Sequence, residues 1–400
     1  MKFSRADRSR LAEWWFTVDH VLLYAILIVV AAGTVLSLAA SPAVALKKGF
    51  HAYYFVERHV FFSLAGLAIM LVVSLLEPAS VRRLAVVVLG ASLVGLIAVY
   101  FLGEEINGAR RWLSIEGHSI QPSEFAKPAF VVVSGWLLAE ARRRPDMPAL
   151  PIAMLLFAIF AGLLVIQPDV GQTMLMTLVW MTMLFVSGLA LKGAAVVAAA
   201  GAVGLYAAYL YYPHVTSRID RFFSPATGDF SQGERALRAF LEGGLLGRGP
   251  GEGTIKTSLP DAHTDYIFAV VAEEFGAVAC LGLLALFAFV VLRALRHAET
   301  EPDAATRLGI VGLALMFGFQ ALINMGVNVG LLPAKGMTLP FLSAGGSSML
   351  AISLTLGMLL ALTRHRPDAD RLKKPPLMPS LPSLRPSVAS KKTSNDEIKQ

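Results

Sequence analysis

Long apolar segments recur along the whole chain, and they constrain the fold more than any other feature. A helix that crosses a bilayer needs about 20 mostly apolar residues. Charged residues make up only 16% of the chain, whereas soluble globular proteins carry roughly a quarter. The sequence therefore predicts an all-α polytopic membrane protein with about ten transmembrane helices. The predicted segments are residues 17–40, 59–77, 84–102, 125–141, 149–167, 169–189, 191–212, 266–292, 307–331 and 345–363.

Composition also excludes several other classes of protein. Hydrophobic residues make up 56% of the chain, which is too many for a mainly disordered protein. Cys280 is the only cysteine, which excludes a disulfide scaffold and a cysteine-rich zinc site. The net charge is +7, but no nucleic-acid-binding motif accompanies it, so we expect no nucleic-acid partner. In a membrane protein, such an excess of positive charge indicates cytoplasmic loops that face anionic lipid.

Lysine and arginine residues indicate which side of the membrane each loop occupies. They are concentrated at the N-terminus, after the second, fourth and eighth segments, and in the C-terminal tail. Because cytoplasmic loops carry the excess of these residues, both termini are predicted to be cytoplasmic. The domains are then a short N-terminal tail at 1–16, a transmembrane domain at 17–363 and a disordered basic tail at 364–400. The long loop at 213–265, between the seventh and eighth helices, is predicted to be external.

Charged residues cluster at two places near the predicted external side. The first cluster is Arg110, Arg111 and Trp112, although an interfacial tryptophan with flanking arginines would look the same. The second consists of Glu124 and Lys127, which are three residues apart and therefore share a helical face. These two residues could form an internal ion pair that fixes helix packing, or Lys127 could bind a phosphate.

Further ionisable residues lie where the sixth and eighth segments begin. Asp169 stands at a helix start, where a carboxylate interacts favourably with the helix dipole. Asp261, His263 and Asp265 lie close together where the long loop enters the eighth segment. Two carboxylates beside a histidine are suited to general acid–base catalysis. A helix cap would explain Asp265 but not the other two residues, so we favour a functional site here.

The ninth segment and the chain that follows it are also polar. Gln320, Asn324 and Asn328 are spaced four residues apart and form one stripe, which we interpret as an attachment between membrane helices. The stretch at 332–348 is rich in Pro and Gly. Irregular backbone of this kind is tolerated within a membrane only where it is buried in protein or lines a wet cavity.

Taken in order, these segments resemble the SEDS family of bacterial cell-wall proteins. The resemblance extends from about residue 17 to residue 363 and is greatest toward the cell-division members of the family. It implies a peptidoglycan glycosyltransferase that polymerises lipid II into glycan strands at the outer face of the inner membrane, at the division septum. The motifs that carry it are at residues 107–112, 121–127, 167–171, 259–268 and 332–348.

The resemblance also assigns roles to individual residues. It makes Asp265 the catalytic base and Trp112 a key residue of the site. Lys127, and Arg110 or Arg111, would stabilise the departing polyprenyl diphosphate, and a divalent cation, Mg²⁺ or Mn²⁺, could share this task. The remaining motif residues that we expect to support the site are Glu124, Asp169, Asp261, His263, Lys335 and Ser347.

The implied partners are lipid II, membrane lipid, a class B penicillin-binding protein of the FtsI type, and the FtsQ, FtsL and FtsB regulators. Two other functions stay open on the sequence alone. A lipid II flippase would also need polar groups in the membrane, but it needs a route from the cytoplasmic side, whereas the ionisable groups lie toward the external side. A non-catalytic division scaffold would leave Asp265 without a function.

Overall fold

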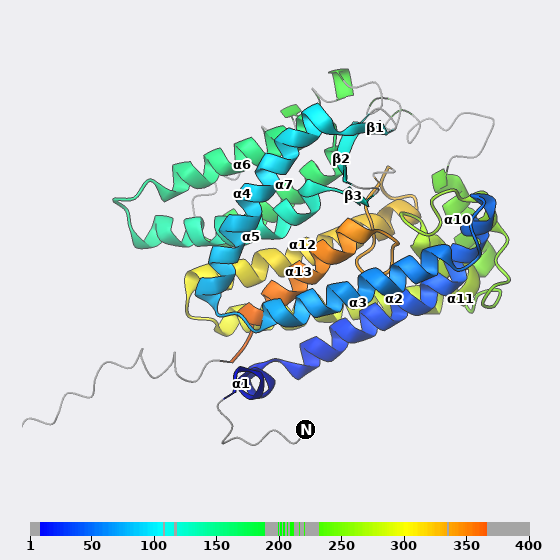
Figure 1. Ribbon diagram of the computed structural model, residues 1–400, viewed down its shortest axis with the longest axis horizontal. Helices are drawn as coiled ribbons and strands as arrows, with labels where there is room; N and C mark the ends of the chain where they lie inside the picture. The colour runs from blue at the N-terminus through cyan, green and yellow to red at the C-terminus, as the bar shows by residue number, and fades with distance from the viewer. Residues whose placement is uncertain are drawn as a thin grey trace, which may run out of the picture. The chain divides into compact units, whose positions relative to one another are not determined.

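The computed structural model describes residues 9–106, 109–115, 118–188, 232–333 and 336–365, and isolated residues between 199 and 220. A short helix α1 (Arg10–Thr17) precedes the long helices, and α10 (Gln232–Gly243) and the 3₁₀ helix η1 (Ile255–Ser258) precede α11 in the chain (Figure 1). The long helices are α2 (His20–Lys47), α3 (Tyr54–Ser74), α4 (Pro78–Leu102), α5 (Pro122–Arg143), α6 (Ala149–Ile166), α7 (Val170–Val186), α11 (Ile267–Thr300), α12 (Ala304–Asn328) and α13 (Gly346–Leu362).

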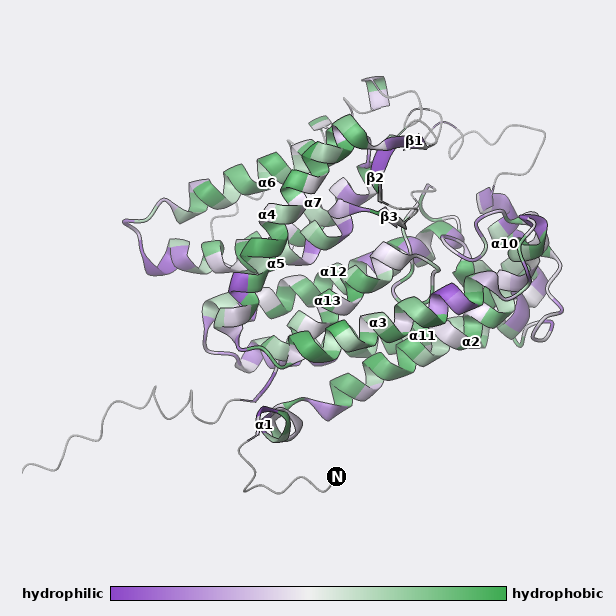
Figure 2. Ribbon diagram, viewed as in Figure 1, coloured by the Kyte–Doolittle hydropathy of each residue, from purple (hydrophilic) through white to green (hydrophobic). Residues whose placement is uncertain are grey.

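Each predicted apolar segment within the described ranges coincides with one of these long helices, and most of the seventh segment, 191–212, lies outside those ranges. Among the described residues, 6 helices are long and apolar enough to cross a membrane: α2, α3, α4, α6, α11 and α12. Figure 2 shows hydrophobic residues along the helices and hydrophilic residues mainly near their ends. A helical protein with several candidate membrane spans is therefore confirmed, while the count of ten stays a prediction.

Helix α5 lies at the centre of the helical unit. It packs against α4, α6, α7, α12 and α13, and nearly all of its first half is buried, including Glu124 and Lys127. Its low hydropathy has a physical reason, since its polar side chains face other helices and not lipid. Because of these polar side chains, α5 is not among the 6 helices that are apolar enough to count as candidate spans.

A small antiparallel sheet lies between α4 and α5. It consists of β1 (Glu104–Ile106), β2 (Ala109–Ile115) and β3 (His118–Ile120), in the order β1-β2-β3. The register pairs Glu105 with Arg110, and Ser114 with Ser119. This sheet corrects the expectation of an entirely α-helical fold. Strand pairing satisfies the backbone groups of a loop that leaves the helices, and strands this short give little periodic signal in a sequence.

Helix α11 is broken near its start. Gly276 has φ 80° and ψ 178°, so the helix is interrupted there. The loop at 244–249 replaces the missing backbone hydrogen bonds. Before the break, the carbonyl groups of residues 273 and 274 accept hydrogen bonds from two N–H groups of the loop, at 2.9 and 3.0 Å. After the break, the N–H groups of residues 277 and 278 donate to two carbonyl groups of the loop, at 3.0 and 3.2 Å. The break is therefore compensated by neighbouring backbone, as a membrane protein requires.

Two glutamates next to this break fasten a further part of the loop. The buried carboxylate of Glu273 accepts hydrogen bonds from the N–H groups of Thr254 and Ile255, both at 2.6 Å, and of Lys256, at 3.0 Å. Glu274 forms a buried ion pair with the ammonium of Lys256. The loop and the first part of α11 are thus joined by side-chain as well as backbone bonds.

The first and last long helices meet at one end of the bundle. Arg364, two residues after the end of α13, donates to the Thr17 hydroxyl at 3.0 Å and to the Leu75 carbonyl at 3.1 Å, and lies 3.3 Å from the Glu13 carboxylate. The start of α2 and the end of α13 therefore lie close together, which agrees with an even number of spans. Arg364, predicted to open the tail, is buried in the helical unit. The tail after His365 lies outside the described residues.

Candidate functional site

The loops that carry the predicted site residues meet at the opposite end of the bundle, which we call the site end. Lys47, at the far end of α2 from Thr17, donates to the carbonyl of Thr257 at 3.2 Å. The segment before α13 joins the segment before α11, since the N–H of Ala344 donates to the carbonyl of His263 at 2.8 Å. Residues far apart in the chain are thereby brought to one place.

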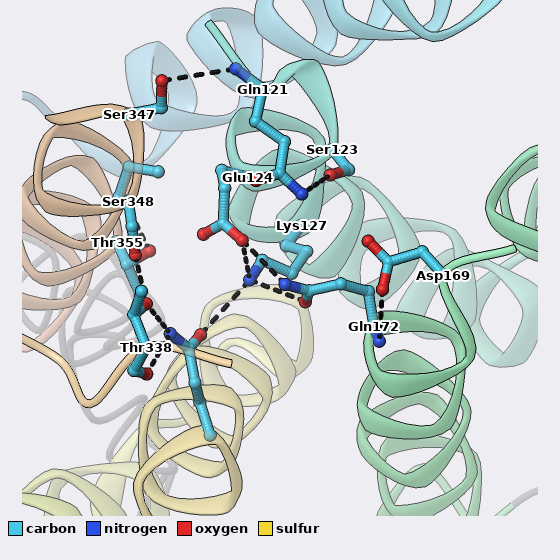
Figure 3. A network of polar contacts seen from close by, with 12 residues as sticks. Gln121, Ser123, Glu124, Lys127, Asp169, Gln172, Thr338, Ser347, Ser348 and Thr355 are labelled. Atoms are coloured by element: carbon cyan, nitrogen blue, oxygen red, sulfur yellow. Dashed lines mark hydrogen bonds and ion pairs between the residues drawn. The ribbon is translucent and has the colours of Figure 1, made fainter. Parts of the chain in front are cut away.

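The ammonium of Lys127 is the centre of a buried polar network (Figure 3). Its Nζ lies 3.0 Å from Oε1 of Glu124, 2.9 Å from Oε1 of Gln172 and 3.2 Å from Oε1 of Gln320. Nε2 of Gln172 donates to the same Glu124 oxygen at 2.7 Å. The expected pair of Glu124 and Lys127 is therefore present. The three N–H donors of the ammonium have three acceptors inside the protein.

This network continues into the irregular segment before α13. Nε2 of Gln320 donates to the carbonyl of Thr338 at 3.1 Å, and the hydroxyls of Thr338 and Ser348 lie 2.6 Å apart. Ser347 joins α13 to the start of α5, because its hydroxyl accepts from the N–H of Gln121 at 3.2 Å (Figure 3). The contacts place Ser347 as a link between elements.

Arg111 fastens the small sheet to the turn between α6 and α7. Its side chain is largely buried, Nη2 donates to the carbonyl of Pro168 at 2.6 Å, and Nε lies 3.8 Å from Oδ2 of Asp169. Asp169 also caps α7, since its Oδ1 accepts from the N–H of Gln172 at 3.4 Å. Asp169 therefore lies at the start of α7, where the helix dipole favours a carboxylate, and Arg111 is engaged within the protein.

Arg110, the next residue on strand β2, has a different environment. Its side chain is 49% exposed and lies 3.7 Å from the carboxylate of Glu105, which is 59% exposed. Trp112, on the same strand, is half-buried. Of the two arginines, Arg110 is therefore the one whose guanidinium is accessible to a ligand.

Asp265 precedes α11 by two residues and is half-buried. Its carbonyl oxygen accepts from Nδ2 of Asn324 and Nδ2 of Asn328, both at 2.9 Å. A methyl group placed on Gly336 would stand 3.6 Å from Oδ2 of Asp265, so the carboxylate lies beside the irregular segment. Asn324 also donates to the carbonyl of Met337 at 2.6 Å, which ties this segment to the same place.

Asp261 and His263 occupy the same turn-rich stretch. Oδ2 of Asp261 accepts from Nε2 of Gln232 on α10 at 3.3 Å. His263 is buried against Phe55, with 4.5 Å between the ring centroids. Burial, together with the positive charge of Lys48, lowers the pKa of His263 to about 4. The imidazole is therefore neutral near pH 7 and packs the loop.

Two groups of predicted site residues are thus formed, one around Lys127 and one around Asp265. The amide stripe joins them, since Gln320 contacts Lys127 while Asn324 and Asn328 hold Asp265. At a rise of 1.5 Å per residue, the two groups are on the order of 6–12 Å apart along α12. From the sequence, the stripe was interpreted only as an attachment between helices, and its contacts with Lys127 and Asp265 were not predicted. The position of the stripe directly before the Pro/Gly-rich segment could have indicated them. Lys335 lies outside the described residues.

Among the residues that the structure describes, no three His, Cys, Asp or Glu side chains lie together in an arrangement that could hold a metal ion. Mg²⁺ is often bound through one or two carboxylates and the phosphates of a substrate. Asp261 offers such a carboxylate. These side chains therefore suit a cation that is bound jointly by a carboxylate and a substrate diphosphate, and not a cation bound by protein side chains alone.

Comparison with known proteins places this arrangement in a family. Residues 19–368 match the FtsW/RodA/SpoVE family, described as cell cycle proteins. A relative from Caulobacter vibrioides, named as a probable peptidoglycan glycosyltransferase FtsW, is 44% identical over 92% of this chain and 94% of its own length. A protein of the same name from Trichlorobacter lovleyi is 35% identical over 88% of this chain and 94% of its own length.

Solved structures agree with these relatives. A chain from a peptidoglycan synthase complex that coordinates polymerization and crosslinking matches with a TM-score of 0.73 and 29% identity, over 89% of this chain and 99% of that chain. The rod shape determining protein RodA of Thermus thermophilus matches with a TM-score of 0.63 and 29% identity, over 87% of this chain and 97% of that chain. With a family match that spans most of its length, this protein belongs to the FtsW/RodA/SpoVE family of cell cycle proteins.

Proposed function

We propose that this protein is a peptidoglycan glycosyltransferase that polymerises lipid II at the outer face of the inner membrane during septal wall synthesis. The observation that carries the proposal is the placement of Asp265, a half-buried carboxylate whose backbone is held by Asn324 and Asn328. The names of the FtsW relatives support the reaction, and the description of the family as cell cycle proteins supports the link to division.

In this reaction the 4-hydroxyl of one lipid II attacks the anomeric carbon of the sugar at the end of a growing chain. Asp265 takes the hydroxyl proton as the new C–O bond forms. The bond between the anomeric carbon and the diphosphate oxygen breaks, and the polyprenyl diphosphate leaves with the electron pair. A carboxylate within reach of the hydroxyl is what this proton transfer requires.

The leaving diphosphate needs cationic partners. Arg110 suits this role best, because its guanidinium is 49% exposed. Lys127 and Arg111 hold neighbouring parts of the protein in place, and we assign them supporting roles. Asp261 would hold a Mg²⁺ or Mn²⁺ if one accompanies the diphosphate, and the cation would neutralise part of its charge.

We also propose a class B penicillin-binding protein of the FtsI type as a partner, together with the FtsQ, FtsL and FtsB regulators. The match to a chain from a peptidoglycan synthase complex supports the first of these. The enzyme is therefore best assayed both alone and with its cognate penicillin-binding protein.

The experiment measures glycan polymer made from lipid II by the purified full-length protein. Asp265→Asn should lower the rate by roughly 10²–10⁴-fold, the usual cost of removing a general base. Asp146→Asn, at an exposed residue in the loop between α5 and α6, is the control and should keep the parent rate. An Asp265→Asn rate above about a tenth of the parent, far outside that range, would place the base elsewhere, with Asp261 next to test.

The same assay distinguishes the two alternatives. A parent protein that makes no polymer with its partner present, yet moves lipid II across a vesicle membrane, would be a flippase. A parent protein that does neither would be a scaffold. Either result would refute the glycosyltransferase proposal.

A further inference from the structure

The carboxamide of Asn328 is inserted into the first turn of α11. Its Nδ2 donates to the carbonyl of Asp265 at 2.9 Å, and its Oδ1 accepts from the N–H of Ala269 at 3.1 Å. Asp265 and Ala269 are four residues apart, so their C=O and N–H groups are the pair that an α-helix would bond directly. One buried side chain therefore takes the place of one helical hydrogen bond.

This insertion has a consequence for the course of the backbone. Without it, the bond from Ala269 to Asp265 would extend α11 backward, and Asp265 would be part of a regular helical turn. With it, α11 begins at Ile267 and Asp265 stays in the preceding turn. The N–H of Ala269 is directed instead to Asn328 and, at 3.1 Å, to the carbonyl of Tyr266.

Asn324 adds a second restraint from the same face of α12. Its Nδ2 donates to the carbonyl of Asp265 at 2.9 Å and to that of Met337 at 2.6 Å. Met337 follows Gly336, where an added methyl group would stand 3.6 Å from Oδ2 of Asp265. Asn324 therefore holds Asp265 and the segment beside its carboxylate at a common point.

We propose that Asn328 and Asn324 are positioning residues for Asp265, and that Asn328 acts by keeping Asp265 out of α11. Amides that served only to hold α12 against its neighbours could bond any polar group there. Asn324 and Asn328 instead both donate to one carbonyl oxygen, that of Asp265. The catalytic part of this inference rests on the proposed glycosyltransferase function. The geometric part stands on the contacts alone.

The kinetic experiment uses Asn328→Leu and Asn324→Leu in the full-length protein, assayed with lipid II and the partner. Misplacement of a reacting group by about 1 Å can cost roughly 100-fold in rate. We expect Asn328→Leu to lower kcat by at least tenfold. Asn324→Leu should lower kcat by less, because the hydrogen bond between Asn328 and the N–H of Ala269 is still present in that variant. KM should stay within about threefold in both, because both amides are buried and bonded to backbone carbonyl groups of the protein.

Thr306→Val is the matched control, since Thr306 is buried on the same helix, at its opposite end, and its hydroxyl donates to Asp303 at 2.7 Å. It removes a partly buried side-chain hydrogen bond whose two partners both lie outside α11. If this control lowers kcat as much as Asn328→Leu, the effect is general destabilisation and the positioning role is refuted.

A pH profile tests the same point by another route. Asn328→Asp keeps the acceptor for Ala269 and places a carboxylate against the backbone carbonyl of Asp265. A nearby like charge disfavours ionisation, so the acidic limb of the kcat profile should move to higher pH. An acidic limb that does not move would contradict the proposed proximity.

The last measurement does not depend on enzymatic activity. Asp265→Cys would be labelled with a membrane-impermeant maleimide, alone and combined with Asn328→Leu or Thr306→Val. Cys280 is buried and gives the background rate. We expect Asn328→Leu to change the labelling rate of residue 265 at least threefold and Thr306→Val to leave it within that limit. A smaller change with Asn328→Leu overturns the inference, whereas a parent protein that makes no polymer overturns only the proposed function.

Discussion

The ammonium of Lys127 on α5 lies 3.2 Å from the amide oxygen of Gln320 on α12, although the two residues are 193 positions apart in the chain. Gln320 in turn donates to the carbonyl of Thr338. The position of a buried cation is therefore coupled to the irregular segment that lies beside Asp265.

This coupling gives a prediction for the buried ion pair. Lys127→Met alone should destabilise the protein by about 3–5 kcal/mol, because it leaves Glu124 as an uncompensated buried charge. The double variant with Glu124→Leu should recover most of that loss. Thermal unfolding in detergent measures both. The double variant should also keep most of its polymerisation activity; a stable but inactive double variant would show that Lys127 itself contacts the substrate.

The two arginines of strand β2 should respond differently to substitution. Arg110→Ala should fold normally and raise the KM for lipid II, because its exposed guanidinium is our candidate diphosphate partner. Arg111→Ala should lower the thermal stability, because it removes the bond to the Pro168 carbonyl. Unfolding temperature and kinetics on both variants check this assignment, and an unchanged KM for Arg110→Ala would argue against it.

Stability should depend on pH through His263. Its pKa is lowered to about 4 in the folded protein, so between about pH 6.5 and pH 4 the unfolded chain binds a proton that the folded chain does not. The free energy of unfolding should therefore fall as the pH drops through this window, by at most about 3 kcal/mol. His263→Phe should flatten the dependence, as measured by thermal unfolding at a series of pH values. A slope that persists in this variant belongs to another group.

The sidedness of the membrane can be tested with reporter fusions. Fusions at residues 5, 144 and 390 should report a cytoplasmic location, and a fusion near residue 230 an external one. The contacts of Arg364 with Glu13 and Thr17 already place the two ends of the helical unit together. A cytoplasmic signal at residue 230 would rule out the predicted ten-span topology.

The parts of the fold that follow from local sequence were predictable. Apolar runs marked the long helices, and the three-residue spacing of Glu124 and Lys127 made their pairing one of two possibilities. The partners Gln172 and Gln320 were not predictable, because they come from helices far away in the chain. The role of Asn328 was missed for the same reason, since an amide stripe gives no indication of which backbone groups it will contact.

The break in α11 has a consequence for engineering this protein. Four backbone groups at the break, on both sides of Gly276, have their partners in the loop at 244–249. An exposed loop can ordinarily be exchanged between homologues as a separate segment, but this one completes the bonding of a helix. A chimaera that swaps it should therefore transfer residues 244–278 as a single block, because a transplanted loop of another geometry would leave helix backbone groups unsatisfied where water is scarce.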